Sequence, residues 1–149
     1  MTRLPDARAI RRHADLSEAA DRCVLSYEER FLRRKMLRTE SGAELLVDLA
    51  TTTDLHHGDA LELADGRLVE IMAAPEDLIE VRGDLVRLAW HIGNRHTPAQ
   101  IEPGRILILR DHVLRDMLEK LGATLAFVRE PFTPEGGAYG HGRTHGHAH

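Results

Sequence analysis

The first half of the chain alternates hydrophobic and polar residues in short runs, and turn-forming residues separate the runs. A period of two is typical of β-strands that bury one face. Asp65-Gly66 is a strong signal for a two-residue hairpin turn, and Ser41-Gly42 lies in a second turn. The sequence therefore predicts a small all-β domain over residues 1–74. Its predicted strands are residues 22–27, 35–39, 44–50, 59–64 and 67–74.

The second half changes to the period of an α-helix. Asp84 is placed to cap a helix that Gly93-Asn94 ends, and Asp111 is placed to cap a second helix that Gly122 ends. Strands are predicted at residues 78–81, 99–103, 105–109 and 123–128. The order βαββαβ is that of a ferredoxin-like domain, in which two helices pack on one face of an antiparallel sheet.

These elements give an α+β protein with three parts. The N-terminal β domain is expected at 1–74 and the ferredoxin-like domain at 75–135, with residues 73–77 as the joint between them. Residues 136–149 are rich in glycine and histidine, a composition typical of a flexible tail.

Composition narrows the functional classes. The 149 residues contain no apolar run near the roughly 18 residues of a membrane span and no apolar signal core, so we expect a cytoplasmic protein with no membrane partner. A net charge of −4 gives no general attraction to nucleic acid, and Phe127 is the one aromatic residue on the last strands. No nucleophile motif, phosphate loop or paired-carboxylate site is evident, so we expect no enzymatic activity. The single Cys23 excludes multi-cysteine metal frameworks.

Ten histidines are unusual in so short a chain, and the pair around Gly93-Asn94 is the first to weigh. His91 and His96 lie about 140° apart around a continuous helix, so they cannot both face one ion. With the helix ended at Gly93-Asn94, His96 falls in the following loop, where it is free to face outward. The structural alternative is a histidine that only caps the helix end.

The tail carries further imidazoles between small residues that leave the backbone free to wrap around an ion. These are His141, His145, His147 and His149. Neutral imidazoles suit nickel, copper or zinc. The alternatives are a purification tag or a disordered end that binds metal only under test conditions. His112 falls at the first turn of the second helix, where the helix dipole keeps its ring neutral, although a capping-region role is the alternative.

A ligand count suggests an oligomer. Nickel takes four to six nitrogen or oxygen ligands, whereas the folded part of one chain offers His96 with no evident carboxylate partner at ligand spacing. A second chain would double the supply. We therefore expect a two-fold homodimer in which His96 of both chains meets at the interface and tail histidines complete the shell. Such a shallow, exchangeable site suits delivery better than storage.

Two further stretches are specific in combination: HIGNRHTPAQI, residues 91–101, and RDHVLRDMLEKLGATLAFVREPFTPEGGAYGHG, residues 110–142. They resemble the UreE family of urease accessory proteins, which are nickel metallochaperones. The resemblance implies a homodimer joined through ferredoxin-like domains, with an N-terminal domain likened to a peptide-binding domain of chaperones. It also implies Ni(II) as cargo at His96 and handover through the accessory GTPase UreG to apo-urease.

The resemblance also marks a departure. Histidines that match His91 and His112 lie near peripheral metal sites in the family, but some members carry another histidine where this chain has Arg110. A peripheral site in this chain is therefore in question. The choice of nickel over Cu(II) or Zn(II) rests on the resemblance, because the affinity order of imidazole sites favours copper. The alternative function is a metal buffer or sequestrant that binds through its tail alone.

Overall fold

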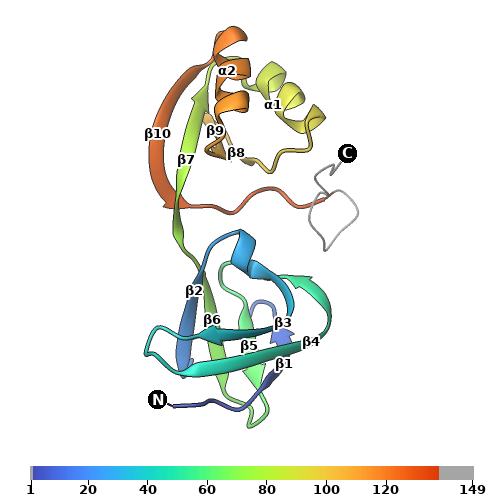
Figure 1. The fold of residues 1–149 in the computed structure, drawn as a ribbon, viewed down its shortest axis with the longest axis vertical. Helices are drawn as coiled ribbons and strands as arrows, with labels where there is room; N and C mark the ends of the chain where they lie inside the picture. The colour runs from blue at the N-terminus through green and yellow to red at the C-terminus, as the bar shows by residue number, and fades with distance from the viewer. Residues whose placement is uncertain (1, 138–149) are drawn as a thin grey trace. The chain divides into compact units, whose positions relative to one another are not determined.

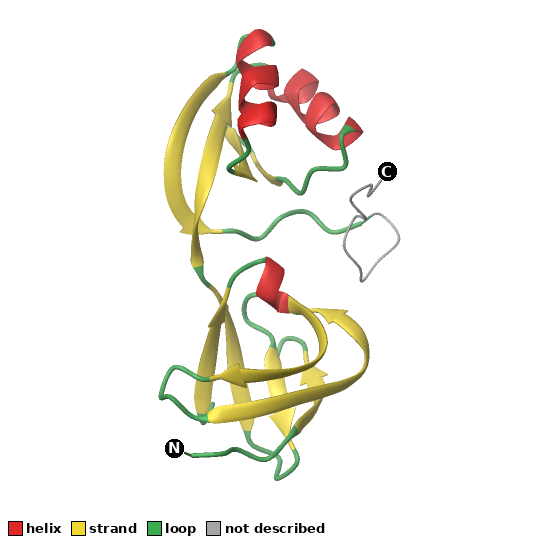
Figure 2. Ribbon diagram, viewed as in Figure 1, coloured by secondary structure: helices red, strands yellow, loops and turns green. Residues whose placement is uncertain are grey.

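The structure is a computed structural model that describes residues 2–137, and the chain divides into two compact units, Met1–Ala74 and Pro75–His149. The first unit is built of strands with one short 3-10 helix, η1 (Glu28–Arg30). Both α-helices belong to the second unit (Figure 2). The mixed α+β fold is therefore as predicted. Among residues 2–137, no helix is long and apolar enough to cross a membrane.

The first unit contains a six-stranded sheet of order β2-β6-β5-β1-β4-β3. The predicted hairpins are confirmed, because β3 pairs antiparallel with β4 and β5 with β6. Alternate residues of β4 are buried, and Leu45, Val47 and Leu49 lie in the core of the unit. The strands are β1 (Ala7–Arg11), β2 (Asp21–Leu25), β3 (Phe31–Arg38), β4 (Glu44–Asp54), β5 (Ala60–Leu63) and β6 (Leu68–Ala73).

Several features of this unit were not predicted, and strands β1 and β4 show why. Strand β1 has an arginine-rich sequence in which only Ala7 is fully buried, so it carries too weak an alternation to be recognised. It is held by its neighbours instead, parallel to β4 and antiparallel to β5. Strand β4 also runs four residues beyond the predicted end, because its polar Thr51–Thr53 segment leads into a renewed pairing with the start of β3.

The second unit has the predicted βαββαβ order. Its sheet has the order β10-β7-β9-β8 with every neighbouring pair antiparallel, which is the ferredoxin-like arrangement (Figure 1). The predicted joint at 73–77 is too long, because β7 begins at Pro75 and leaves only Ala74 after β6. The strands are β7 (Pro75–Arg82), β8 (Gln100–Glu102), β9 (Arg105–Leu109) and β10 (Thr124–Pro131), and the helices are α1 (Leu85–Asn94) and α2 (His112–Lys120).

Both predicted helix caps are present. The carboxylate of Asp84 accepts the N–H of Arg87, and that of Asp111 accepts the N–H groups of Val113 and Leu114. Each helix packs its apolar stripe on the same face of the sheet, where it forms the core of the unit. The buried residues of this core are Ile79, Val81, Leu88, Ile92, Ile106, Ile108, Leu114 and Leu118.

A cluster of charges surrounds Arg105 on β9. Its guanidinium lies 2.9 Å from Glu80, 3.0 Å from Glu102 and 2.7 Å from Glu130. Hydrogen bonds from Arg82 and then Arg105 lower the pKa of Glu80, and hydrogen bonds from Arg105 lower the pKa of Glu130. The cluster therefore joins all four strands of the sheet: β7, β8, β9 and β10.

Arg105→Gln should lower the free energy of unfolding at pH 7, because it leaves three carboxylates together without their shared cation. The fold lowers the pKa of Glu80 and Glu130, so their contribution is present above the ordinary value near 4.5 and is lost as the pH falls through the lowered value. The difference between variant and parent should therefore shrink as the pH falls through those lowered pKa values. Urea unfolding at a series of pH values from 7 downward tests this, and a difference that stays constant over the series would contradict it.

Candidate metal centre

His96 lies in the loop after α1, as predicted, and has an unusual backbone conformation. Its φ is 56°, in the left-handed region. The N–H of His96 donates to Gly93 O at 2.9 Å, and the N–H of Thr97 donates to Ile92 O at 3.4 Å, which ends the helix. Glycine is the usual residue at such a reversal, and another residue costs roughly 1 kcal/mol there. His13 has the same conformation, with a φ of 58°, so the left-handed backbone positions His96 but does not by itself mark a site.

The half-buried side chain of His96 lines an open cavity of about 150 Å³. The end of α1, the following loop and β8 form most of the wall. Glu135, which follows β10 by four residues, completes it. Glu135 therefore lines the same cavity as His96, although spacing along the sequence does not predict that the two residues meet. The lining residues are Ala89, Gly93, His96, Thr97, Pro98, Ala99, Ile101 and Glu135.

An exposed apolar surface adjoins this cavity. Val86 and Trp90 are 86% and 64% exposed on α1, and Ile101 is 51% exposed on β8. Val86, Trp90 and Gly93 recur at intervals of four and three residues, so they share one stripe of the helix. Exposed large apolar side chains gathered in this way mark an interaction surface. We call Val86, Trp90 and Ile101 the apolar rim of the His96 cavity.

His91 and His112 lie in a different place, a groove of about 700 Å³ between α1 and α2. His91 is half-buried and contacts Trp90 edge-to-face, with ring centroids 5.0 Å apart. His112 is the exposed first residue of α2. The structure thus brings these two histidines to one groove and leaves His96 outside its lining, consistent with the helical spacing of His91 and His96.

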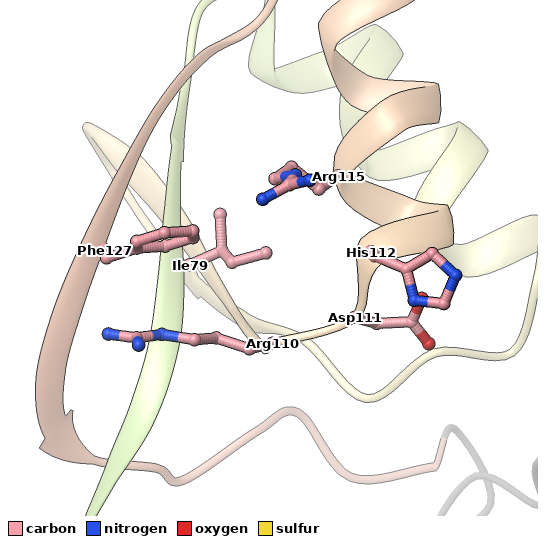
Figure 3. A pocket seen from close by; sticks show the side chains of 6 residues that line it. All are labelled: Ile79, Arg110, Asp111, His112, Arg115 and Phe127. Carbon is pink, nitrogen blue, oxygen red and sulfur yellow. The ribbon is translucent and has the colours of Figure 1, made fainter.

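Arg110 and His112 both line a further pocket, of about 410 Å³ (Figure 3). Its guanidinium lies 4.4 Å from the ring centroid of Phe127 and donates to the carbonyl oxygens of Leu78 and Val128. In Figure 3 the side chain extends toward Phe127 and away from His112. A guanidinium has no lone pair to offer a metal, so this position cannot serve as the second peripheral ligand.

The remaining candidates do not form a site within the described residues. Between residues 2 and 137, no group of three or more histidine, cysteine, aspartate or glutamate side chains is arranged to hold a metal ion. Cys23 is buried, and burial raises the pKa of its thiol to about 11, so it stays protonated. Four predicted tail ligands lie outside the described residues: His141, His145, His147 and His149.

Comparisons with known proteins place both units in one family. The family model described as "UreE urease accessory protein, N-terminal domain" matches residues 2–74, and the one described as "UreE urease accessory protein, C-terminal domain" matches residues 69–149. Together they cover nearly the whole chain.

Individual relatives are similar in sequence to this chain over most of their length. A urease accessory protein UreE of Ruegeria pomeroyi is 68% identical over 147 residues, which are 98% of this chain and 99% of the relative. The UreE of Cereibacter sphaeroides is 60% identical over 150 aligned positions, covering 100% of this chain and 82% of the relative. The UreE of Brucella anthropi is 52% identical over 85% of this chain and 76% of its own length. The chain therefore belongs to the UreE family of urease accessory proteins.

Proposed function

We propose that this protein is a non-catalytic, cytoplasmic nickel carrier for urease assembly. Two copies form a two-fold homodimer. The His96 side chains of both copies bind a single Ni(II) ion at the interface. Tail histidines add ligands, and the ion passes through the accessory GTPase UreG to apo-urease. The observation that carries this proposal is the position of His96, in a strained left-handed turn beside an exposed apolar rim.

The apolar rim supports the dimer. Val86, Trp90 and Ile101 would leave water if a second copy covered them, and burying a large apolar side chain is favourable by about 1.5–3 kcal/mol. A two-fold interface brings the same surface of both chains together, so a residue near the axis meets its own counterpart. His96 adjoins the rim, and two such imidazoles in one site begin the ligand set that a single chain lacks.

The tail histidines are attached close to this site. The described chain ends at Gly137, two residues after Glu135, which lines the His96 cavity. His141 follows Gly137 by four residues, a separation that extended chain spans in at most about 14 Å. The later tail histidines have longer reach. This connection supports a role for the tail in completing the metal site.

The first unit supports the role of a partner-binding domain. Its edge strand β3 has one side without a neighbouring strand in the six-stranded sheet, and it carries exposed Phe31 and Met36 among arginine and lysine residues. Strand edges accept extended peptide segments through backbone hydrogen bonds. We assign contact with protein partners to this edge.

His96→Ala should lower the affinity of the tightest nickel-binding event by more than about 100-fold, because the metal loses one imidazole from each chain. The dimer in metal-free buffer should persist, since the apolar rim is unchanged. Calorimetric titration with Ni(II), with the oligomer mass measured by light scattering on the same samples, tests both parts. If the titrations of parent and variant coincide, the protein is instead a buffer that binds through its tail.

Trp90→Asp should convert the dimer to a monomer and remove the tightest nickel-binding event although His96 is retained, because two carboxylates would face each other in the rim. Val24→Asp is the matched control, since Val24 is also an exposed apolar residue but lies on β2 of the first unit. The oligomer mass and Ni(II) affinity are measured for both variants. A dimeric Trp90→Asp protein would show that the rim is not the interface.

Truncation after Tyr139 should reduce the number of nickel ions bound per dimer more than it reduces the affinity for the first ion. The variant loses His141, His145, His147 and His149 but keeps His96. Equilibrium dialysis gives the stoichiometry and calorimetry gives the first affinity. An unchanged stoichiometry would exclude the tail as a nickel-binding segment.

A further inference from the structure

The segment after β10 crosses from one edge of the ferredoxin-like sheet to the other. Phe132 is fully buried and fixes its beginning. Further on, the N–H of Thr133 donates to Gln100 Oε1 at 2.9 Å, and the N–H of Glu135 donates to Ala99 O at 2.8 Å. Figure 1 shows this segment leaving β10, passing β7 and running toward the β8 side of the unit. We call residues 132–137 the crossing segment.

The crossing segment sets Glu135 at the His96 cavity through its backbone. The hydrogen bond to Ala99 holds the main chain of Glu135, and the residue lines the cavity that contains His96. The residue is exposed, so its carboxylate is accessible. Its position results from main-chain contacts and does not require the carboxylate itself.

In the described part of the chain, the carboxylate of Glu135 is unpaired, as is that of Glu119, whereas most acidic groups of this unit have a partner. Glu80, Glu102 and Glu130 share Arg105, and Asp77 pairs with Arg129 at 2.9 Å. Among residues 2–137, the carboxylate of Glu135 makes no ion pair or hydrogen bond. Its oxygens keep their full capacity to bind a cation.

Carboxylate oxygen and imidazole nitrogen together form a donor set that tetragonal or octahedral Ni(II) accepts. One protomer contributes one of each at this cavity, and the two-fold dimer would contribute two of each, which gives four donors. Two carboxylates also balance the 2+ charge of the ion at a partly buried interface, where an unbalanced charge is costly. The described residues of a single chain offer too few ligands for Ni(II), and these four donors would reach the minimum number that it takes.

We infer that Glu135 is a metal ligand, supplying a carboxylate oxygen to the ion that His96 holds. This inference rests on the proposed function, because it takes the His96 pair as the nickel site. It assigns to the crossing segment a role beyond its contacts with the chain around β8: the hydrogen bond to Ala99 holds Glu135 at the cavity that His96 lines.

The test is a calorimetric Ni(II) titration of the full-length protein, of two variants at residue 135 and of one control variant. Glu135→Gln keeps the size and the backbone hydrogen bond but removes the charged donor, and it should weaken the tightest event about tenfold. Glu135→His supplies a neutral imidazole donor and should restore tight binding. Glu119→Gln, which removes the same charge from an exposed position on α2, should bind as the parent does.

The outcomes separate this inference from the proposed function. Equal affinities for parent and Glu135→Gln would overturn it, as would equal weakening in Glu135→Gln and Glu135→His, since a ligand role requires rescue by another donor. Weakening by Glu119→Gln to the same extent would also overturn it, because the effect would then be one of net charge. A His96→Ala titration that matches the parent would instead overturn the proposed function. Circular dichroism and the thermal midpoint confirm that each variant is folded.

Discussion

The left-handed backbone of His96 is the constraint on which the candidate site depends. It ends α1, and the hydrogen bonds from His96 and Thr97 back to Gly93 and Ile92 reverse the chain toward β8. The same reversal puts the imidazole at the end of the exposed stripe that Val86 and Trp90 begin.

The crossing segment is the second constraint, because it brings distant parts of the chain to this turn. The sheet order β10-β7-β9-β8 sets the last strand and β8 at opposite edges. Backbone and amide hydrogen bonds from Thr133 and Glu135 then join the end of β10 to the chain around β8. The proposed donors therefore come from a helix end and from a segment 39 residues later, and main-chain hydrogen bonds hold both residues in place.

Much of the fold followed from local signals. The caps at Asp84 and Asp111 and the apolar stripes predicted both helices, and the βαββαβ order then left few topologies. Strand β1 was missed because its pairing with β4 and β5, rather than its own pattern, makes it a strand. Glu135 was missed for a related reason: the main-chain bond to Ala99 that sets it by His96 has no signature in sequence spacing. Arg110 was recognised as a departure, but its contact with Phe127 required the structure.

A metal ion shared across a two-fold interface has a thermodynamic consequence for a carrier. In the proposed function, Ni(II) contacts both protomers, so it binds the dimer more tightly than the separate chains. By linkage, it must strengthen the dimer by the same factor. A partner that replaces one protomer's ligands at the rim lowers the affinity for the ion without needing to unfold either chain. His96 is half-buried in an open cavity outside the hydrophobic core, so a competing ligand can reach it. A site of this kind retains its cargo in the dimer and gives it up on contact with a competing ligand set, as delivery requires.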